Sequence, residues 1–574
     1  MAPAREIVYS VITTTESGQS VGVLVDGVVF PLHPSSECPI LFTGKAPEAK
    51  EGYKYVKTID GQVEEHEVSM RPMRHEDAPN EFYNRTWNTA SIAEFPDVLP
   101  HLPVINRIES GLHDHTQIPT IHLAAEQDDV NLMHTNLTSV IKITSKMTYI
   151  RLNDVKSFTD VKIKLAGRSS RLQPKPSYNI ILPKKSKLFG YRRIKLRSLM
   201  TDPSYIREQL SYDFMKSIGL PTSGFSFVRV FLNNQPLGLF GLMENYKNPW
   251  LKNEFGGGKR YEQGILYQGM ALGNMLKGPV SGAQSDLAYR GPDQALYADG
   301  TYQVKQEPNI DSPKDYTKLM ELTKFLAEAP TTSPDAVKIW QKWIDTECLI
   351  RNMVAEILLG LSDGYIVFVD NYYLYLHPQD NRFIFLASDV DVSLGSTCVK
   401  LSDMWSGDYR TFPGMSHTRP LVQKMLEVPQ FRERFENLLV ELCQKIFNLE
   451  AMSQRIDDLA NMVREDVQWD KQLLTIKINA RRAKSNATAD SASEPASMES
   501  TSKESSGRNY TNELPPPFDP AVVADLVARV SKGDVSLDDA VNGPTGHISL
   551  AGIKEWIDQQ SKATLAHFKV SETK

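Results

Sequence analysis

The stretch SDGYIVFVDNYYLYLHPQDNRFIFLASDVDVSLG, residues 362–395, decides how the fold of this chain is interpreted. It contains two aromatic and apolar runs, 372–376 and 383–386, which predict two strands joined by a short polar loop. Upstream, apolar residues recur every four positions from Leu349 to Leu361 and predict a buried helix that ends at a Ser-Asp-Gly turn. The two strands should run antiparallel, so the start of the first should lie beside the end of the second.

Four polar residues lie at the ends of these predicted elements. Asp363 follows the helix, Asn371 precedes the first strand, and Asp389 and Asp391 follow the second. Magnesium is often held by one or two carboxylates together with substrate phosphates, and phosphoryl transfer needs an Asp that positions the accepting hydroxyl. Each residue alone is more commonly part of a turn or a strand end. Together they predict one site, in which Asp363 positions the hydroxyl, Asn371 and Asp389 bind Mg²⁺, and Asp391 is a further ligand or a structural partner.

Length and composition limit the class of protein. With 574 residues the chain exceeds one ordinary core, and two or more lobes are expected. The formal net charge of −6 argues against nucleic acid as the main partner, and the lack of any apolar run of about 18 residues argues against a transmembrane segment. The four cysteines are widely separated, which is unlike a CxxC zinc site or a dense disulfide framework.

Two features bear on the cellular compartment and leave it open. Residues 1–26 lack the charged and apolar regions of a signal peptide. Asn-x-Thr sequons would be glycan acceptors if the chain is secreted, although their number is only modestly above chance. They begin at Asn84, Asn136, Asn486 and Asn509.

The sequence pattern changes along the chain and predicts four parts. Near the N-terminus, apolar and polar residues alternate on both sides of Asp26-Gly27, which is a strong hairpin signal. Further on, strand patterns surround one helix after Pro203, and helical patterns then dominate apart from a tract rich in Ser, Thr, Glu and Pro. We predict a β module (1–64), an extended connection (65–144), a strand-rich small lobe (145–245) and a mostly helical large lobe (246–574) with a disordered insertion at about 484–517.

Several residues of the predicted small lobe suit a phosphate ligand. Lys175 precedes a predicted strand, where its ammonium group could neutralise phosphate oxygens. Arg207 and Glu208 on the predicted helix could pair with Lys175 or with phosphate, and Glu244 could bind a nucleotide or brace a loop. For each, a solvated lysine, an exposed ion pair or an ordinary turn is the alternative. The backbone amides of a small-residue turn could also hold phosphate, and that turn consists of Gly167, Arg168, Ser169, Ser170 and Arg171.

Six motifs occur in a fixed order along the chain. They are GRSSR (167–171), KPSY (175–178), DPSYIR (202–207), LGLFGLME (237–244), DNYYLY (370–375) and SDVDVSLG (388–395). Over roughly 145–450 the chain resembles the CotH family, the spore coat protein H kinases. The N-terminal module and VNGPTG (541–546) are similar to the fungal, Mucorales-type branch, whose members are secreted surface proteins and include host-cell invasins.

This resemblance implies an α+β, atypical protein-kinase-like bilobal fold that binds ATP and Mg²⁺ between its lobes and phosphorylates coat or surface proteins. It implies that Asp363 is the catalytic Asp, that Asn371 and Asp389 are metal ligands, and that Lys175 is the nucleotide lysine beside the phosphate loop 167–171. It also implies a secreted, spore-surface or cell-surface location. We therefore expect Lys175 and Asp389 to face one cavity.

Two other functions stay open. The chain could be a non-enzymatic invasin that binds a host receptor through an exposed loop, and residues 267–291, rich in Gly, Met and polar residues, are the candidate. An apolar strand followed by Asp-x-Asp, as at 383–391, also begins the sites of haloacid-dehalogenase phosphatases and metal-dependent glycosyltransferases. The phosphatase alternative ranks lower, because the helix-rich flanks lack the βα repeats that its sheet needs.

Overall fold

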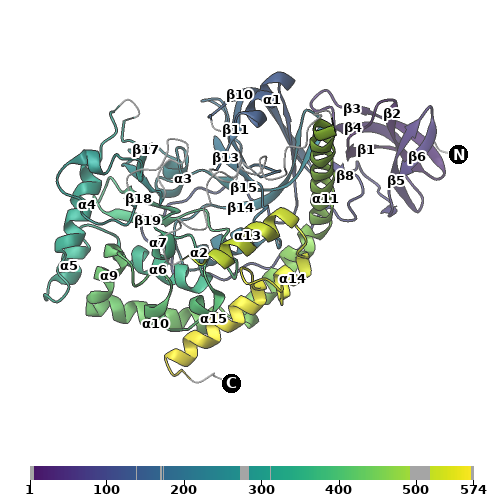
Figure 1. Cartoon of the computed structure of the whole chain (residues 1–574). Coiled ribbons are helices and arrows are strands. Elements are labelled where there is room, and N and C mark those ends of the chain that lie inside the picture. The colour runs from purple at the N-terminus through teal and green to yellow at the C-terminus, as the bar shows by residue number, and fades with distance from the viewer. Residues whose placement is uncertain are drawn as a thin grey trace.

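The computed structural model describes residues 5–137, 139–167, 171, 173–271, 284–309, 312–490 and 518–570, with the backbone alone over 477–490. Within these ranges the chain forms an N-terminal sheet, a closed barrel, and a smaller sheet surrounded by helices (Figure 1). The mixed α+β class predicted from the sequence is confirmed. Most of the predicted disordered insertion, residues 491–517, lies outside the described residues.

The N-terminal sheet has eight strands in the order β6-β5-β2-β3-β4-β1-β8, with β7 paired to β5. Asp26-Gly27 forms the predicted tight turn, because Val25 pairs with Val28 across it. Both turn residues have positive φ, 47° and 82°, which favours Asp and Gly in such turns. The sheet also includes strands C-terminal to residue 64. Its strands are β1 (Glu6–Ile12), β2 (Gln19–Val25), β3 (Val28–Pro34), β4 (Leu41–Pro47), β5 (Gly52–Ile59), β6 (Gln62–His66), β7 (Arg71–Pro72) and β8 (Glu81–Phe82).

The next seven strands close into a barrel in the order β10-β11-β12-β13-β15-β14-β9. Helix α1 (Gln127–Thr135) contacts β10 and β11, and it lies with β9 in the stretch predicted as an extended connection. The helix predicted after Pro203 is α2 (Arg207–Ser217), and Gly219 follows it with a φ of 73°. The barrel strands are β9 (Thr120–Ala124), β10 (Ile143–Arg151), β11 (Asp154–Leu165), β12 (Tyr178–Ile181), β13 (Arg193–Arg197), β14 (Phe225–Leu232) and β15 (Gln235–Glu244).

The smaller sheet has four antiparallel strands in the order β17-β16-β18-β19. The predicted hairpin is confirmed, since β18 (Tyr372–Leu376) pairs with β19 (Phe383–Ala387). Helix α6 (Thr346–Leu359) packs against β19 and ends before Gly360, whose φ is 64°. The other strands are β16 (Leu266–Gly269) and β17 (Tyr302–Gln306). The loop predicted over 267–291 thus begins inside β16, and its residues 272–283 lie outside the described part of the chain.

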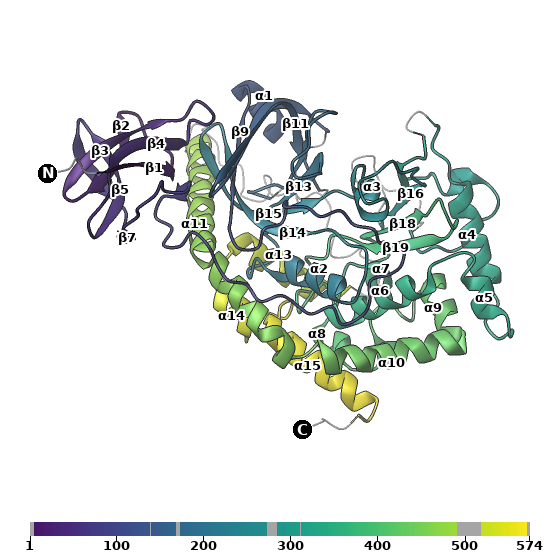
Figure 2. The same cartoon turned by 180° about the vertical axis from the view of Figure 1, so that it is seen from behind.

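Helices lie around the smaller sheet and also contact the barrel. Helix α11 (Leu449–Asp490) contacts β15 and passes between the barrel and the N-terminal sheet (Figure 1, Figure 2). Its Trp469 contacts Phe82 of β8 and Phe231 of β14, so this helix joins the N-terminal sheet to the barrel. The other helices are α3 (Trp250–Phe255), α4 (Thr317–Glu328), α5 (Ala336–Trp340), α7 (Tyr365–Phe368), α8 (Leu401–Met404), α9 (Pro420–Glu427), α10 (Pro429–Lys445), α13 (Pro520–Lys532), α14 (Leu537–Asn542) and α15 (Ile553–His567), with 3-10 turns at Gln294–Leu296 and Tyr409–Thr411.

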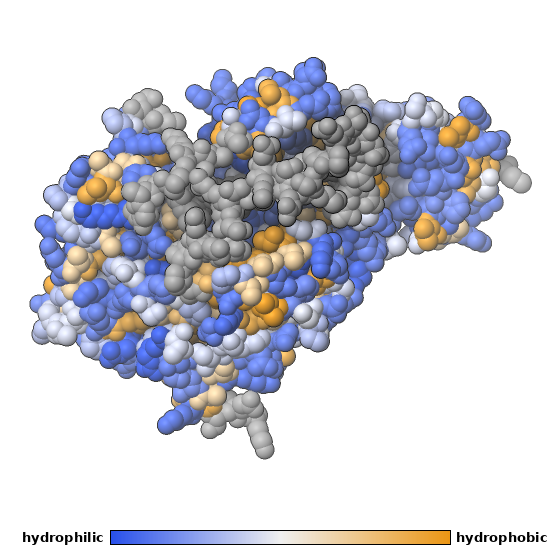
Figure 3. Space-filling view, viewed as in Figure 1, coloured by the Kyte–Doolittle hydropathy of each residue, from blue (hydrophilic) through white to orange (hydrophobic). Residues whose placement is uncertain are grey.

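One hydrophobic core extends from the barrel through α2 and α6 to the four-stranded sheet, and the N-terminal sheet has a core of its own. The helices of the described part include none that is both long and apolar enough to cross a membrane. The face shown in Figure 3 is mostly hydrophilic, and a group of apolar residues lies near α13, where Val527 is 60% exposed. The shared core fixes the barrel against the four-stranded sheet.

Candidate active site between the barrel and the four-stranded sheet

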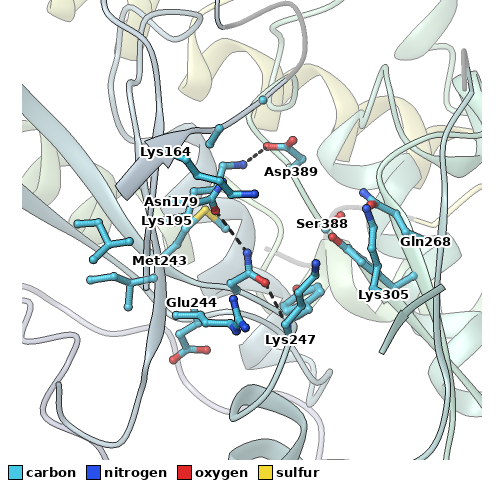
Figure 4. A pocket seen from close by; sticks show the side chains of 18 of the residues that line it. Lys164, Asn179, Lys195, Met243, Glu244, Lys247, Gln268, Lys305, Ser388 and Asp389 are labelled. Atoms are coloured by element: carbon cyan, nitrogen blue, oxygen red, sulfur yellow. Dashed lines mark hydrogen bonds and ion pairs between the residues drawn. The ribbon is translucent and has the colours of Figure 1, made fainter. Parts of the chain in front are cut away.

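A cleft of about 410 Å³ opens between the barrel and the four-stranded sheet. One wall consists of residues from β11, β12, β13 and β15, and the other consists of residues from β16, β17 and β18 together with the turn after β19. Figure 4 shows Lys195 of the barrel directed toward Asp389, with Ser388 and Lys305 on the same side as Asp389. The cleft therefore places a barrel wall rich in cations opposite the Asp-x-Asp turn.

The hairpin β18-β19 joins the two ends of the stretch 362–395. The Ser388 N–H donates to the Asn371 carbonyl at 2.8 Å, which holds the residue before β18 beside the residues after β19. Asn371 and Asp389 both have a left-handed backbone, with φ of 55° and 58°, a conformation in which Asn and Asp are enriched. Both residues line the cleft. The predicted closeness of Asn371 and Asp389 is therefore observed.

Asp363 lies beside Asn371 and is half-buried. The Nδ2 of Asn371 donates to Asp363 Oδ2 at 2.8 Å and to the Asp363 carbonyl at 3.3 Å. Burial, and then the negative charges of Asp391 and Asp389, raise the pKa of the Asp363 carboxyl well above its usual range. Among the described residues, the lining of the cleft includes Asn371 but not Asp363. Asp363 is therefore in direct contact with a residue that lines the cleft.

Two cations on β13 contact the Asp-x-Asp turn. Lys195 Nζ lies 3.2 Å from Asp389 Oδ1. Arg197, two residues further along the same face of the strand, contacts both Asp389 and Asp391. Its Nε donates to Glu208 on α2 at 2.8 Å. The sequence predicted this strand but not the role of its cations. The available signal was the alternation of cations and apolar residues in RIKLR.

Arg197 is thus surrounded by three carboxylates. Burial raises the pKa of Glu208 to about 7, and Arg197 opposes that shift. Burial also raises the pKa of Asp391, while Arg197 and a hydrogen bond from Thr201 Oγ1 at 2.6 Å act against it. The guanidinium therefore keeps the turn and α2 together by offsetting charges that would otherwise repel one another.

The oxygen donors of the turn fit a hard cation such as Mg²⁺. Asn371 directs its Nδ2 to Asp363, and no described residue donates to its Oδ1, so this oxygen can serve as a ligand. Asp389 adds a carboxylate, and Mg²⁺ is commonly bound by one or two carboxylates with water and phosphate. Within the described ranges, no three or more His, Cys, Asp or Glu side chains form a complete metal site. The donors therefore fit an ion that a phosphate ligand helps to hold.

Lys175, the predicted nucleotide lysine, lies outside the cleft. Its Nζ is 2.7 Å from Asp470 Oδ1 on α11, it donates to the Leu239 carbonyl at 2.5 Å, and its side chain is 2% exposed. The expectation that Lys175 and Asp389 face one cavity is therefore wrong. Asp470 is 295 residues away along the chain, so sequence spacing gave no sign that it would bury this lysine. Lys195 contacts Asp389 in its place.

Three further predicted nucleotide contacts are used elsewhere. Glu208 pairs with Arg197 and is not part of the lining of the cleft. Arg207 is fully buried and pairs with Asp202 at 2.6 Å, and its other hydrogen bonds go to Ser204 Oγ and to backbone carbonyls. Glu244 lines the cleft, but its carboxylate contacts Arg107 and accepts from Trp250 Nε1 at 2.8 Å on the far side of β15 (Figure 4). None of these three side chains is directed into the cleft, because each is held by its protein partners.

Part of the predicted phosphate loop reaches the cleft. Gly167 and Arg171 belong to its lining, and Arg171 Nε donates to the Gly167 carbonyl at 2.9 Å. Gly167 has a φ of 79°, which favours glycine at this position. Residues 168–170 lie outside the described part of the chain.

The comparison with known proteins covers this region. Residues 163–489 match the family described as CotH kinase protein. This stretch is more than half of the chain, and it contains the cleft residues from Lys164 to Asp389. The chain belongs to the CotH family.

CotH proteins similar to this chain come from a fungus and a bacterium. The chain is 26% identical to invasin CotH7 of Rhizopus delemar over 480 aligned residues. The aligned region covers 82% of this chain and 75% of that protein. It is 27% identical to invasin CotH3 of the same fungus, over 82% of this chain and 76% of that protein. It is 23% identical to the inner spore coat protein H of Bacillus subtilis, over 54% of this chain and 78% of that protein.

Proposed function

We propose that this CotH protein is an atypical, bilobal protein kinase. It would transfer the γ-phosphoryl group of ATP, with Mg²⁺ as cofactor, to a Ser or Thr hydroxyl of a coat or surface protein. The observation that carries the proposal is the cleft in which Asn371 and Asp389 face the cationic barrel wall that includes Lys195. Phosphoryl transfer is catalysed mainly by positioning and by neutralising phosphate charge, and these are the groups that it needs.

Each residue has one task in this proposal. Asn371 and Asp389 hold Mg²⁺, which supplies positive charge at the phosphates when it is bound. Lys195 donates to phosphate oxygens. Asp363 orients the acceptor hydroxyl and takes its proton while the new oxygen–phosphorus bond forms and the bond to the ADP oxygen breaks. Burial and the neighbouring carboxylates raise the pKa of Asp363, which makes its carboxylate a stronger base than that of a solvent-exposed Asp.

Incubation of the protein with Mg²⁺, γ-labelled ATP and a coat protein tests this function. Asp363→Asn keeps the shape of the side chain but removes the proton acceptor, so label transfer should fall about 10³-fold. Calorimetry should show that this variant still binds ATP. Asp403→Asn on α8 changes an exposed acid outside the cleft and is the matched control. Wild-type transfer by Asp363→Asn would remove its proposed role, and no label on protein with wild type would contradict the kinase function.

The names of the fungal relatives favour a second function, binding of a host-cell receptor at a spore or cell surface. This function does not need the cleft, and one protein can have both. Asp389→Ala separates them, because it removes a carboxylate that the kinase function requires. Receptor binding that survives the loss of label transfer would assign the two functions to different surfaces. Loss of both, in a variant that melts like wild type, would place the receptor contact at the cleft.

A further inference from the structure

We propose that the cleft contains a separate oxyanion subsite, formed by Lys164, Arg193 and Lys247, that binds phosphate or carboxylate groups without a metal ion. The subsite lies on the barrel wall, beside the Asp-x-Asp turn rather than at it. The proposal deepens the proposed kinase function, but metal-free anion binding can be measured whether or not phosphoryl transfer occurs.

The three cations come from neighbouring places on one wall. Lys164 is on β11, Arg193 begins β13, and Lys247 follows β15, and all three line the cleft. Arg193 shares a face of β13 with Lys195, two residues and about 7 Å away along the strand. Asn179 of β12 pairs with Lys164 of β11 on one side and with Lys195 of β13 on the other. Figure 4 shows Lys164 and Lys247 on the barrel side of the cleft.

The three cations of the subsite lack a carboxylate partner of the kind that neighbouring Lys195 has. Lys195 pairs with Asp389, whereas no carboxylate of the described residues forms an ion pair with the three cations of the subsite. The acidic residues in the described lining are Glu244 and Asp389, and both contact other cations. Half-buried positive charges without a counter-charge raise the free energy of the empty cleft. An anion that enters it would lower that free energy.

The titration of the lysines reflects the same surroundings. Burial, followed by the positive charges of Arg193 and Lys164, lowers the pKa of Lys247 to about 8. Burial, followed by Lys142, Arg171 and Arg193, lowers the pKa of Lys164. A bound anion favours the charged form of each lysine, so it should raise both pKa values and cause proton uptake at pH 8.

Two amide side chains complete the subsite. Asn179 and Asn245 line the cleft, and Asn245 Nδ2 lies 3.4 Å from Asn179 Oδ1. Amide N–H groups beside three cations favour oxyanions over neutral ligands. The oxyanion has two sources in a kinase cleft. It can be a phosphate group of the nucleotide, or it can be an acidic or phosphorylated side chain of the acceptor protein.

Inorganic tripolyphosphate, titrated by calorimetry into the full chain in EDTA, tests the subsite. Wild type should bind it, and Lys247→Met should bind it at least about tenfold more weakly, because a charge-assisted hydrogen bond is lost. Arg193→Met should weaken tripolyphosphate binding to a similar extent. Lys185→Met removes an exposed charge outside the cleft and should bind like wild type. Lys164→Met replaces any variant whose melting curve shows that it does not fold. Equal binding by all variants, or no binding by wild type, overturns the proposal.

A second titration separates the two sources. A peptide with Ser flanked by Glu is added to protein saturated with Mg²⁺ and a non-hydrolysable ATP analogue. If the acceptor supplies the anion, the peptide binds and Lys247→Met weakens it about tenfold. If the nucleotide supplies the anion, the ATP analogue displaces tripolyphosphate, and Lys247→Met leaves the affinity for the peptide unchanged. Both results support the subsite. If label is transferred but tripolyphosphate does not bind, the subsite alone is overturned. If tripolyphosphate binds but no label is transferred, the kinase function alone is overturned.

Discussion

The two sides of the barrel use lysine and aspartate in different surroundings. Next to α11, Lys175 and Asp470 form a pair whose side chains are 2% and 1% exposed. In the cleft, Lys195 and Asp389 are 16% and 35% exposed. A pair closed off from solvent leaves no room for a ligand, whereas the cleft pair is accessible to one. The surroundings of a charge, more than its residue type, therefore separate structural residues from candidate site residues.

The buried pair should give the largest effect, and the effect should be on stability. Lys175→Met leaves Asp470 buried without its cation, so the free energy of unfolding should fall by about 3 to 5 kcal/mol. Urea denaturation measures this loss. Lys175→Met combined with Asp470→Leu should recover part of it, because the uncompensated charge is then gone. A loss within about 0.5 kcal/mol, as for surface substitutions, would show that the pair is not structural.

The cleft pair should give the opposite pattern, which sharpens the comparison. Lys195→Met should change the free energy of unfolding by less than about 1 kcal/mol, because a partly exposed pair is screened by solvent. Label transfer should fall about 10²-fold, as expected when one preorganised donor to a phosphate is lost. Initial rates and urea denaturation of the same preparation supply both values. If Lys195→Met unfolds the protein while Lys175→Met abolishes transfer in folded protein, the two roles are exchanged.

The comparison also explains which parts were predictable from sequence. The hairpin that joins Asn371 to Asp389 depends on strand and turn patterns within one short stretch, and those patterns predicted it. Lys175 and Lys195 are not separated by any local pattern, because each lies beside or within a strand. Their partners are set by closure of the barrel and by the path of α11, which bring together residues 295 and 194 positions apart. The motif order indicated the family, but it did not indicate which lysine enters the cleft.

Arg107 provides an intermediate case, because it is shared by two buried carboxylates. It contacts Glu244 and lies 2.7 Å from Glu254 Oε2 on α3. Although burial acts to raise it, Arg107 and His113 lower the pKa of Glu244 to about 2. Burial raises the pKa of Glu254 to about 7, since Arg107 offsets only part of that effect and Glu244 adds to it. One guanidinium therefore compensates one carboxylate well and the other poorly.

This imbalance predicts a pH dependence of stability. The unfolded chain releases the Glu254 proton near pH 4.3, whereas the folded chain keeps it up to about pH 7. The stabilisation from this group is therefore present at low pH and is lost as the pH rises through that window. Glu254→Gln resembles the protonated form, so relative to wild type it should gain about 1 to 3 kcal/mol between pH 5 and pH 8. Urea denaturation at both pH values measures this gain, with Glu328→Gln at an exposed position of α4 as the control. A constant difference between Glu254→Gln and wild type would mean that Arg107 compensates both carboxylates, which would place this cluster with the closed pair of Lys175.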